Sequence, residues 1–231
     1  MKTYLITTKL YMKKDLHHLE MYEALSKLVN LSFVKDEGLA ERHKAAGFKA
    51  YVYSMPFPIP KQTGVYKEGK LFQFILKTTD EDFARKMLVY LPQCESHFMK
   101  NIVSTMKIVN DSFVSQIRTL TPAVITINSK SWFKNQPLED LIMAIHNNAM
   151  KKYMQLTGET LDCKCFIQGI QVLTEKPFAI PYKGGKIMGH HLILDIKGDD
   201  SSQKLAQIVL GQGLSEKNSL GMGYVVPLKN N

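Results

Sequence analysis

The glycine-rich segment of this chain reads Gly211-Gln-Gly-Leu-Ser-Glu-Lys-Asn-Ser-Leu-Gly-Met-Gly223. Its two Gly-x-Gly pairs enclose a polar centre. Glycine has no Cβ, so such a segment turns sharply and can bring backbone N–H groups against a ligand. Lys217 adds a cation. Residues 211–223, named the glycine-rich loop below, therefore predict a contact with phosphate. The alternative, a plain surface turn, normally needs only one or two glycines.

The surroundings of the loop exclude the common nucleotide-binding motifs. A P-loop needs Gly-Lys-Ser/Thr at the start of a helix, whereas Asn218 follows Lys217. A dinucleotide fingerprint needs a third glycine where this chain has Glu216, with a strand before it and a helix after it. Residues 224–228 form one short apolar run, which leaves no room for a βαβ unit.

The loop belongs to a series of predicted elements in the second half of the chain. A helix is predicted near residues 202–210, before the loop, and a strand at 223–228, after it. Pro137 opens another helix, because proline suits the first helical position and apolar residues then recur along one side. The other strands are predicted within 115–128, at 162–174 and at 187–197. The resulting order is βαββαβ.

The first half of the chain repeats that order. Apolar spacing predicts a helix over 15–33, and Asp80 can cap a second helix that Pro92 ends. The strands are predicted at 2–10, 48–55, 71–76 and 101–114. Because βαββαβ is the order of the ferredoxin-like fold, we predict an α+β protein with two tandem ferredoxin-like (RRM-like) domains, residues 1–115 and 116–231. A single α+β domain of another topology is the alternative.

The composition is that of a folded basic protein. Of the 231 residues, 45% are hydrophobic and 22% are charged, and 30 Lys and Arg against 21 Asp and Glu give a net charge of +9. Such an excess favours a polyanionic partner, through phosphate contacts and counterion release. The cations are scattered along the chain, which is typical of a charged folded surface rather than a disordered tail.

The cysteines and the apolar runs indicate in which cellular compartment the protein is expected. Three cysteines cannot all pair, and residues 1–9 lack an apolar stretch suited to an export signal. No apolar run approaches the ~20 residues of a membrane span. We therefore expect a cytoplasmic protein without membrane contact. Cys163-Lys-Cys165 and His190-His191 lack the spacing of common zinc sites, so no metal and no other cofactor is expected.

The glycine-rich loop resembles a family motif. Residues 211–225 look like the C-terminal glycine-rich motif of the CRISPR-associated repeat-processing endoribonucleases of the RAMP superfamily. The preceding run, Met188-Gly-His-His-Leu-Ile-Leu-Asp-Ile-Lys-Gly198, fits the family's approach to the loop. The family is built of two ferredoxin-like domains, so the resemblance covers nearly the whole chain. Non-catalytic relatives also carry glycine-rich loops, so cleavage has to be inferred from the first half.

A second stretch resembles the family's active site. In Glu41-Arg-His-Lys-Ala-Ala-Gly-Phe-Lys-Ala-Tyr51, a histidine is followed six residues later by a lysine. The resemblance implies His43 and Lys49 as catalytic residues. The family often adds a tyrosine on the first helix, where this chain has Leu28, and Tyr22 lies nearly two turns earlier. The RNA-binding residues expected in the loop are Gly211, Gly213, Lys217, Asn218, Ser219, Gly221 and Gly223.

The resemblance implies a metal-independent endoribonuclease. The 2′-OH of RNA can attack the adjacent phosphate, with histidine as general acid or base and lysine opposite the developing charge. Cleavage within each CRISPR repeat of the pre-crRNA then leaves a 5′-OH and a 2′,3′-cyclic phosphate and produces guide crRNAs. The alternative is a non-catalytic RNA-binding subunit of a CRISPR effector complex. Repeat RNA is the expected partner, with such a complex as a further candidate, and the protein is either a monomer or a homodimer.

Further cations and aromatic residues are candidates for RNA contact. Lys151, Lys152, Lys183 and Lys186 add charge to the second half. Tyr51 and Tyr53 in the predicted strand either stack on bases or pack beneath the helices.

Overall fold

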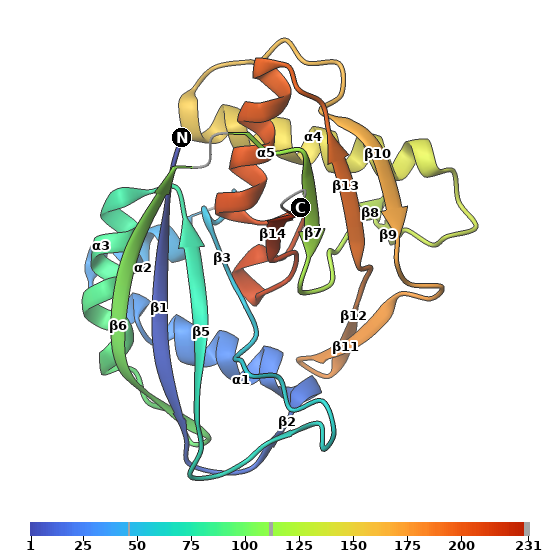
Figure 1. Cartoon of the computed structure of the whole chain (residues 1–231). Coiled ribbons are helices and arrows are strands. Elements are labelled where there is room, and N and C mark those ends of the chain that lie inside the picture. The colour runs from blue at the N-terminus through green and yellow to red at the C-terminus, as the bar shows by residue number, and fades with distance from the viewer. Residues whose placement is uncertain (46, 111–112, 229–231) are drawn as a thin grey trace.

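The computed structural model describes residues 1–45, 47–110 and 113–228. Two four-stranded antiparallel sheets lie side by side, one in each half of the chain (Figure 1). The first has the order β3–β5–β1–β6 and the second β10–β13–β7–β14. In both, the first strand of the half lies between the third and the fourth, as in a ferredoxin-like fold. The predicted α+β class with two ferredoxin-like units is confirmed.

The strands of the first sheet enclose a core with three helices. The sheet strands are β1 (Lys2–Met12), β3 (Tyr51–Tyr53), β5 (Leu71–Thr78) and β6 (Met99–Asn110). The helices are α1 (His18–Asn30), α2 (Glu37–Lys44) and α3 (Glu81–Tyr90), with short 3₁₀ turns η1 (Phe33–Lys35) and η2 (Leu91–Gln93) and a small pair β2 (Leu16–His17) and β4 (Val65–Tyr66). Alternate residues of β1, including Ile6 and Leu10, are buried against the helices.

The second half repeats the arrangement and adds hairpins. Its sheet strands are β7 (Gln116–Thr119), β10 (Ile167–Val172), β13 (Leu192–Ile196) and β14 (Val225–Leu228). Its helices are α4 (Leu138–Thr157) and α5 (Asp200–Gln212), with the turn η3 (Asn218–Leu220) and the hairpins β8 (Thr126–Ile127) with β9 (Lys130–Ser131) and β11 (Phe178–Tyr182) with β12 (Gly185–Gly189). Pro137 precedes α4, and Asp199 caps α5 by accepting from the Ser202 amide.

Several elements differ from the sequence-based expectation. The helix predicted over 15–33 ends at Asn30, and α2 follows it unpredicted. The strand predicted at 187–197 is divided into β12 and β13, and β11 was not predicted. Apolar periodicity could not reveal α2, because Leu39 is its only buried residue; the Asp36 cap, which accepts from the Leu39 amide at 2.9 Å, was the available signal.

The two halves meet through buried contacts. The Lys77 amine donates to the Val225 carbonyl at 2.8 Å and lies 4.5 Å from the centre of the Tyr224 ring. One core cluster extends from Tyr4 to Met99 in sequence and another from Val114 to Val225. The boundary between domains at residue 115 stays a prediction.

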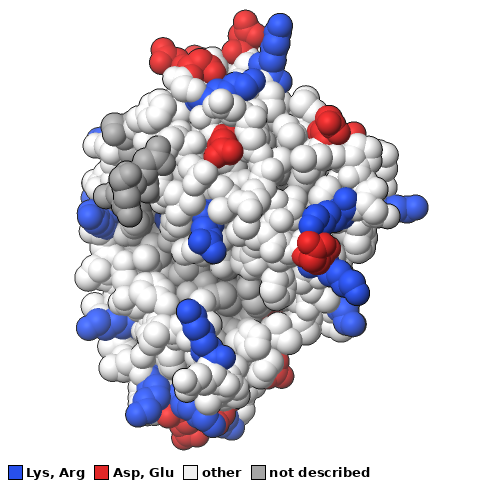
Figure 2. Space-filling model, turned by 45° about the vertical axis from the view of Figure 1, so that its right-hand side comes forward, with Lys and Arg blue, Asp and Glu red and all other residues white. Residues whose placement is uncertain are grey.

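On the face drawn in Figure 2, the cations are spread rather than gathered in one patch. Figure 2 shows Lys and Arg side chains spread over one face, some of them around a central hollow, with Asp and Glu between them. Within the described residues, none of the helices is both long and apolar enough to cross a membrane.

Candidate functional site

His43 lies in the last turn of α2, with its side chain exposed. One face of its imidazole contacts the Phe33 ring, at a centroid distance of 4.7 Å. Partial burial, with a smaller contribution from the positive charge of Lys49, lowers the pKa of His43 below its ordinary value. The neutral imidazole, which can accept a proton, is therefore favoured at neutral pH.

Lys49 caps the C-terminal end of α2, the helix that contains His43. Its amine donates to the backbone carbonyls of Arg42, His43 and Ala45 at 2.8, 2.9 and 2.5 Å. These contacts occupy the three donors of the ammonium group and satisfy carbonyls that a helix end leaves free. Burial lowers the pKa of Lys49. Lys49 thus fixes the backbone of His43 and puts a positive charge beside it, but a phosphate oxygen would have to replace one of these carbonyls.

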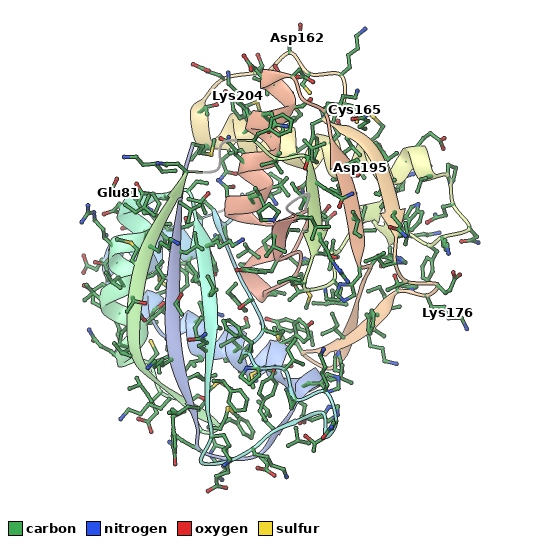
Figure 3. The ribbon with its side chains drawn as sticks, in the orientation of Figure 1. Glu81, Asp162, Cys165, Lys176, Asp195 and Lys204 are labelled. Atoms are coloured by element: carbon green, nitrogen blue, oxygen red, sulfur yellow. The ribbon has the colours of Figure 1, made fainter. Side chains whose placement is uncertain are left out.

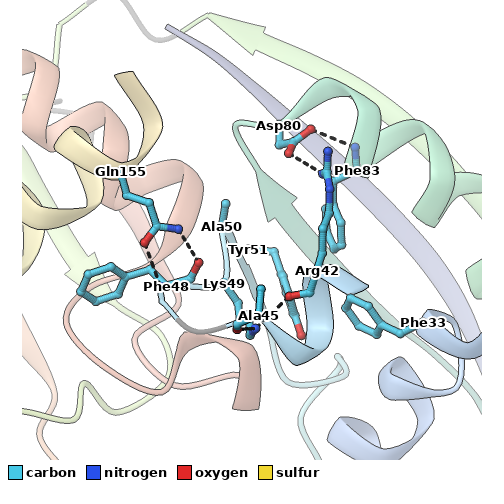
Figure 4. A pocket seen from close by; sticks show the side chains of 10 residues that line it. All are labelled: Phe33, Arg42, Ala45, Phe48, Lys49, Ala50, Tyr51, Asp80, Phe83 and Gln155. Atoms are coloured by element: carbon cyan, nitrogen blue, oxygen red, sulfur yellow. Dashed lines mark hydrogen bonds and ion pairs between the residues drawn. The ribbon is translucent and has the colours of Figure 1, made fainter. Parts of the chain in front are cut away.

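A small cavity of about 200 Å³ lies beside this helix end (Figure 4). The rings of Phe33, Tyr51 and Phe83 form part of its lining, with Phe33 5.8 Å and Phe83 5.1 Å from Tyr51 between centroids. At its rim, Arg42 pairs with Asp80 at 2.7 Å. Because Arg42 and Asp80 already bind each other, their charges are not free to bind a ligand in this cavity.

The backbone between His43 and β3 is held by the second half of the chain. Gln155 of α4 donates to the Phe48 carbonyl and accepts from the Phe48 amide, both at 2.9 Å (Figure 4). Gly47, with φ of +110°, lies directly against Gln155, where an added Cβ would be 3.0 Å from the amide oxygen. Gln155 was not predicted as a site residue, since nothing in the residue spacing of α4 indicates that this glutamine binds a distant backbone.

The glycine-rich loop packs against β3. All four glycines are buried. A Cβ on Gly221, whose φ is +80°, would lie 2.6 Å from the Tyr53 ring, and one on Gly213 would lie 2.5 Å from the Asn218 amide and 3.0 Å from Val52. Glycine is therefore needed for close approach to the first sheet at Gly221, and for packing against both Asn218 and the first sheet at Gly213. Contact of Gly211, Gly213, Gly221 and Gly223 with RNA stays a prediction.

A buried lysine holds the loop from inside. Lys152 of α4 is 1% exposed, and its amine donates to the carbonyls of Gly213 and Ser215 at 2.7 and 2.8 Å and to the Asn218 side chain at 2.6 Å. Burial lowers the pKa of Lys152 to about 7. Lys152 was predicted as a cation for RNA, but it has no free surface. The position of Lys152 in α4 could have indicated that it is buried, since it continues the buried face of the helix after Ile145 and Ala149.

The polar residues of the loop differ in orientation. Asn218 is buried, and its side-chain amide donates to the carbonyls of Leu214 and Met222. Lys217 is exposed and has a left-handed backbone with φ of +59°. Ser219 is half-buried and lies beside the hydroxyl of Tyr51. Of the three predicted RNA contacts, Lys217 is thus the one whose side chain is open to solvent, and RNA contact by each of them stays a prediction.

The structure links the two predicted parts of the site through β3. The centroid of the Tyr51 ring is 5.8 Å from that of Phe33, and the Phe33 ring in turn contacts the His43 ring. The Tyr51 hydroxyl lies near Ser219 of the loop. Leu28 and Tyr22, at and near the family's tyrosine position, are both buried. Burial raises the pKa of Tyr22 far above its ordinary value.

The cysteine and histidine pairs lie apart. Cys163 and Cys165 precede β10, whereas His190 and His191 precede β13, which runs antiparallel to β10. In Figure 3, Cys165 lies at the end of the second sheet where Lys204 is found, and Lys176 lies at the opposite end. His190 is buried and bonded to Thr174 and the Trp132 carbonyl. Among the described residues, no group of three or more His, Cys, Asp and Glu could hold a metal ion.

Solved structures share this fold over the full chain. A structure described as an RAMP protein binding different RNA substrates has a TM-score of 0.76 at 17% identity, covering 98% of this chain and 100% of that one. A Cas6-related protein of Pyrococcus furiosus has a TM-score of 0.73 at 15% identity, covering 99% and 100%. A CRISPR associated protein Cas6 has a TM-score of 0.69 at 17% identity, covering 98% and 100%. At these identities the likeness establishes the fold.

The sequence itself matches a family description. No curated protein matches the chain in sequence. The model of the family described as CRISPR associated protein Cas6, C-terminal, matches residues 104–227, which is more than half of the chain. This match includes the whole glycine-rich loop. The chain therefore belongs to the Cas6 family of CRISPR-associated RAMP proteins.

Proposed function

We propose that this protein is an endoribonuclease that cleaves CRISPR repeat RNA without a metal ion, releasing guide crRNAs. The observation that carries the proposal is the exposed His43 imidazole, with a lowered pKa, at a helix end that Lys49 closes. Membership in the Cas6 family supports an RNA substrate, and so does the description of one similar structure as a binder of different RNAs. The net charge of +9 is consistent with such a partner.

The proposed reaction uses a nucleophile that RNA itself supplies. The 2′-OH loses its proton and attacks the adjacent phosphorus, and the bond to the 5′-oxygen of the next nucleotide breaks. The departing 5′-oxygen takes up a proton, so that one product ends in a 2′,3′-cyclic phosphate and the other in a 5′-OH. His43 serves as general base or acid in these transfers, worth roughly 10²- to 10⁴-fold in rate. The charge of Lys49 favours the transition state, in which negative charge builds on the phosphoryl oxygens.

RNA binding is assigned to the second part of the site. Among the loop residues predicted to bind RNA, Lys217 is exposed and Ser219 is half-buried, so these two are proposed to contact the RNA directly. Asn218 and the four glycines are proposed to shape the loop, and their backbone groups to face the RNA where the loop is open. In this scheme domains 1–115 and 116–231 supply the cleaving and the holding groups, respectively.

A second candidate is the non-catalytic RNA-binding subunit of a CRISPR effector complex. Two observations favour it. The Lys49 amine is fully engaged with backbone carbonyls, and Leu28 occupies the position where the family often has a tyrosine. A protein with these features could retain the fold and the loop and bind RNA without cutting it.

Cleavage in the presence of EDTA separates the two candidates. The purified chain is incubated with its cognate repeat RNA in EDTA, and the ends of the products are mapped. We expect one cut per repeat, with a cyclic phosphate and a 5′-OH. A repeat with a 2′-deoxy sugar before the cut should bind and remain whole, and its cleavage would refute attack by the 2′-OH. Binding of the natural repeat without any cleavage would establish the second candidate instead.

A further inference from the structure

β6 is the outer strand of the first sheet. It pairs with β1 on one side only, and Figure 1 shows it at the left edge of this sheet. The turn before β6 covers the beginning of its other side. Ser96 donates to the Met99 carbonyl at 2.8 Å, and Asn101 donates to the Cys94 carbonyl at 3.0 Å. Residues 102–110, named the β6 edge below, have no strand on that side in the described part of the chain.

The pairing within the sheet determines which backbone groups of the β6 edge face outward. In an antiparallel sheet, successive residues of a strand bond alternately to the strands on its two sides. The Ser54 amide donates to the Ile75 carbonyl, so Ile75 bonds towards β3 and not towards β1. Its partner in β1, Thr7, therefore bonds to β6, where it is opposite Thr105. By alternation, the residues of β6 whose amides and carbonyls face away from the sheet are Ser104, Met106 and Ile108.

The β6 edge lacks most of the features that keep an outer strand unpaired. Proteins usually protect such strands by making them short, by placing charges or proline in them, or by a bulge. The β6 edge contains neither proline nor glycine, and Lys107 is its only charged residue. The register shift between β1 and β6 lies at its first residue and leaves the rest regular. Its apolar side chains are open to solvent, since Ile102, Val103 and Ile108 are 44–48% exposed.

A second copy of the same strand is complementary to this edge. Two β6 edges can pair antiparallel around a two-fold axis at Met106, so that this residue is opposite itself and Ser104 is opposite Ile108 of the second copy. Those are the residues whose amides and carbonyls face outward, so the backbone groups of all three gain partners. On the face of the sheet away from the helices, Val103 is then opposite Val109 of the second copy. Apolar pairs directly opposite each other stabilise a sheet.

Other pairings fit this edge less well. With the axis at Lys107, two ammonium groups would be directly opposite each other, which is destabilising, whereas with the axis at Met106 each Lys107 is opposite a threonine. The remaining outer strands of the chain are also poorer partners. β3 has three residues and packs against the glycine-rich loop, β10 contains Gly169, and β14 contains Pro227. The best partner for a β6 edge is therefore another β6 edge.

We propose that two copies of this chain form a symmetric dimer in which their β6 edges pair antiparallel around Met106. The two first sheets then become one continuous sheet, and the contact is the same from both sides, as two-fold symmetry requires. β3, which packs against the glycine-rich loop, is at the opposite edge of the first sheet, so each copy retains its own complete candidate site. The inference does not depend on whether the protein cuts RNA.

Disulfide trapping tests the pairing and its register. In Met106→Cys, the two introduced thiols are directly opposite each other, with Cα atoms about 5.5 Å apart, a separation that a disulfide bridges. Mild oxidation should therefore give a covalent dimer on a non-reducing gel. Ile108→Cys is the matched control, because its two copies are four residues apart along the strands, about 13 Å. Both variants keep the natural Cys94, Cys163 and Cys165, so equal cross-linking of the two variants, or of neither, would overturn the proposal.

Sedimentation velocity over the micromolar range measures the assembly without a cross-link. We expect the wild-type chain to shift from the mass of one chain to that of two. Met106→Lys places like charges at the axis and should raise the dimer Kd at least about 10-fold, whereas Met106→Leu should keep it. Val34→Lys adds the same charge at an exposed residue of η1 and should leave the Kd unchanged. A wild-type chain that stays monomeric, or a dimer that Met106→Lys does not weaken, would refute the β6 interface.

Discussion

The glycine-rich loop and the segment from His43 to Lys49 differ in how much of each is buried and in how each is held in place. The loop is almost wholly buried, and Lys217 alone among its described residues is fully exposed. The His43 segment is exposed along most of its length and is fixed mainly through its backbone, by Lys49 from one side and Gln155 from the other. The polar side chain of Asn218 is used for bonds within the loop, whereas the His43 imidazole is left open to solvent.

Helix α4 connects the two regions. Lys152 binds the loop and Gln155 binds the backbone of Phe48. Residues three apart lie on the same side of a helix, so one turn of α4 fixes both regions relative to each other. The comparison therefore predicts separable effects: changes at His43 should affect chemistry, changes at Lys152 stability, changes at Gln155 alignment, and changes at Lys217 RNA affinity.

The largest effect is expected for His43→Ala. Loss of the general acid or base should lower the single-turnover cleavage rate at saturating protein by about 10²- to 10⁴-fold. The Kd for the 2′-deoxy repeat should stay the same, because the side chain is not part of the buried structure. The exposed His97, changed to Ala, is the matched control. Undiminished cleavage by His43→Ala would remove His43 from the mechanism.

Lys152→Met should destabilise the protein. The substitution keeps much of the side-chain volume but leaves three oxygens of the loop without their donor, which we expect to cost about 2–4 kcal/mol of unfolding free energy. Urea denaturation measures this change. A loss below ~1 kcal/mol would mean that the loop keeps its shape without the lysine.

The pH dependence of that difference follows from the lowered pKa of Lys152. The group loses its proton near pH 7 in the folded protein but only near 10.5 in the unfolded chain. The unfolded chain thus binds more protons between these values, so the stability contribution of this group rises with pH and is lost as pH falls towards 7. The unfolding free energy of wild type relative to Lys152→Met should increase from pH 6 to pH 9. A difference that is constant over this range would contradict the lowered pKa.

Gln155→Ala should have an intermediate effect, on cleavage rather than on binding. Loss of both bonds to Phe48 frees the backbone after His43, and small misplacements of a catalytic group are costly. We expect the single-turnover rate to fall about 10-fold with an unchanged Kd for RNA. Met154→Ala, at the neighbouring exposed position of α4, is the control. A raised Kd with an unchanged rate would assign Gln155 to RNA binding instead of alignment.

Lys217→Ala should have the smallest effect. Removing one phosphate contact should raise the Kd for repeat RNA a few-fold and reduce the slope of log Kd against log salt by about 1, equally for all sequences. Lys217→Arg should restore both, and Lys204→Ala on the exposed side of α5 should change neither. If the salt dependence of Lys217→Ala equals that of wild type, this lysine is an ordinary surface cation.

The two sheets could be predicted from the sequence, but the long-range contacts that join the parts of the candidate site could not. Alternating strands, the Asp80 cap and the Pro137 start are local signals, and they sufficed to predict the ferredoxin-like order. Helix α2 was missed because its residues are polar and it buries only Leu39. The bonds of Lys152 and Gln155 were missed because their partners lie 61 and 107 residues away, and no local pattern specifies such contacts. The residues of the candidate site could thus be predicted from the sequence. The contacts by which Lys152 and Gln155 hold these residues in place could not.

The fit of Gly221 against Tyr53 and of Gly213 against Val52 has an evolutionary consequence. These glycines are required by close packing whether or not the protein cuts RNA, since a Cβ on Gly221 would lie 2.6 Å from the Tyr53 ring and one on Gly213 would lie 2.5 Å from the Asn218 amide and 3.0 Å from Val52. Selection on folding alone would preserve them after activity had been lost. Descendants with a mutated His43 should therefore keep the same glycine pattern, and the pattern records ancestry and architecture more faithfully than it records catalysis.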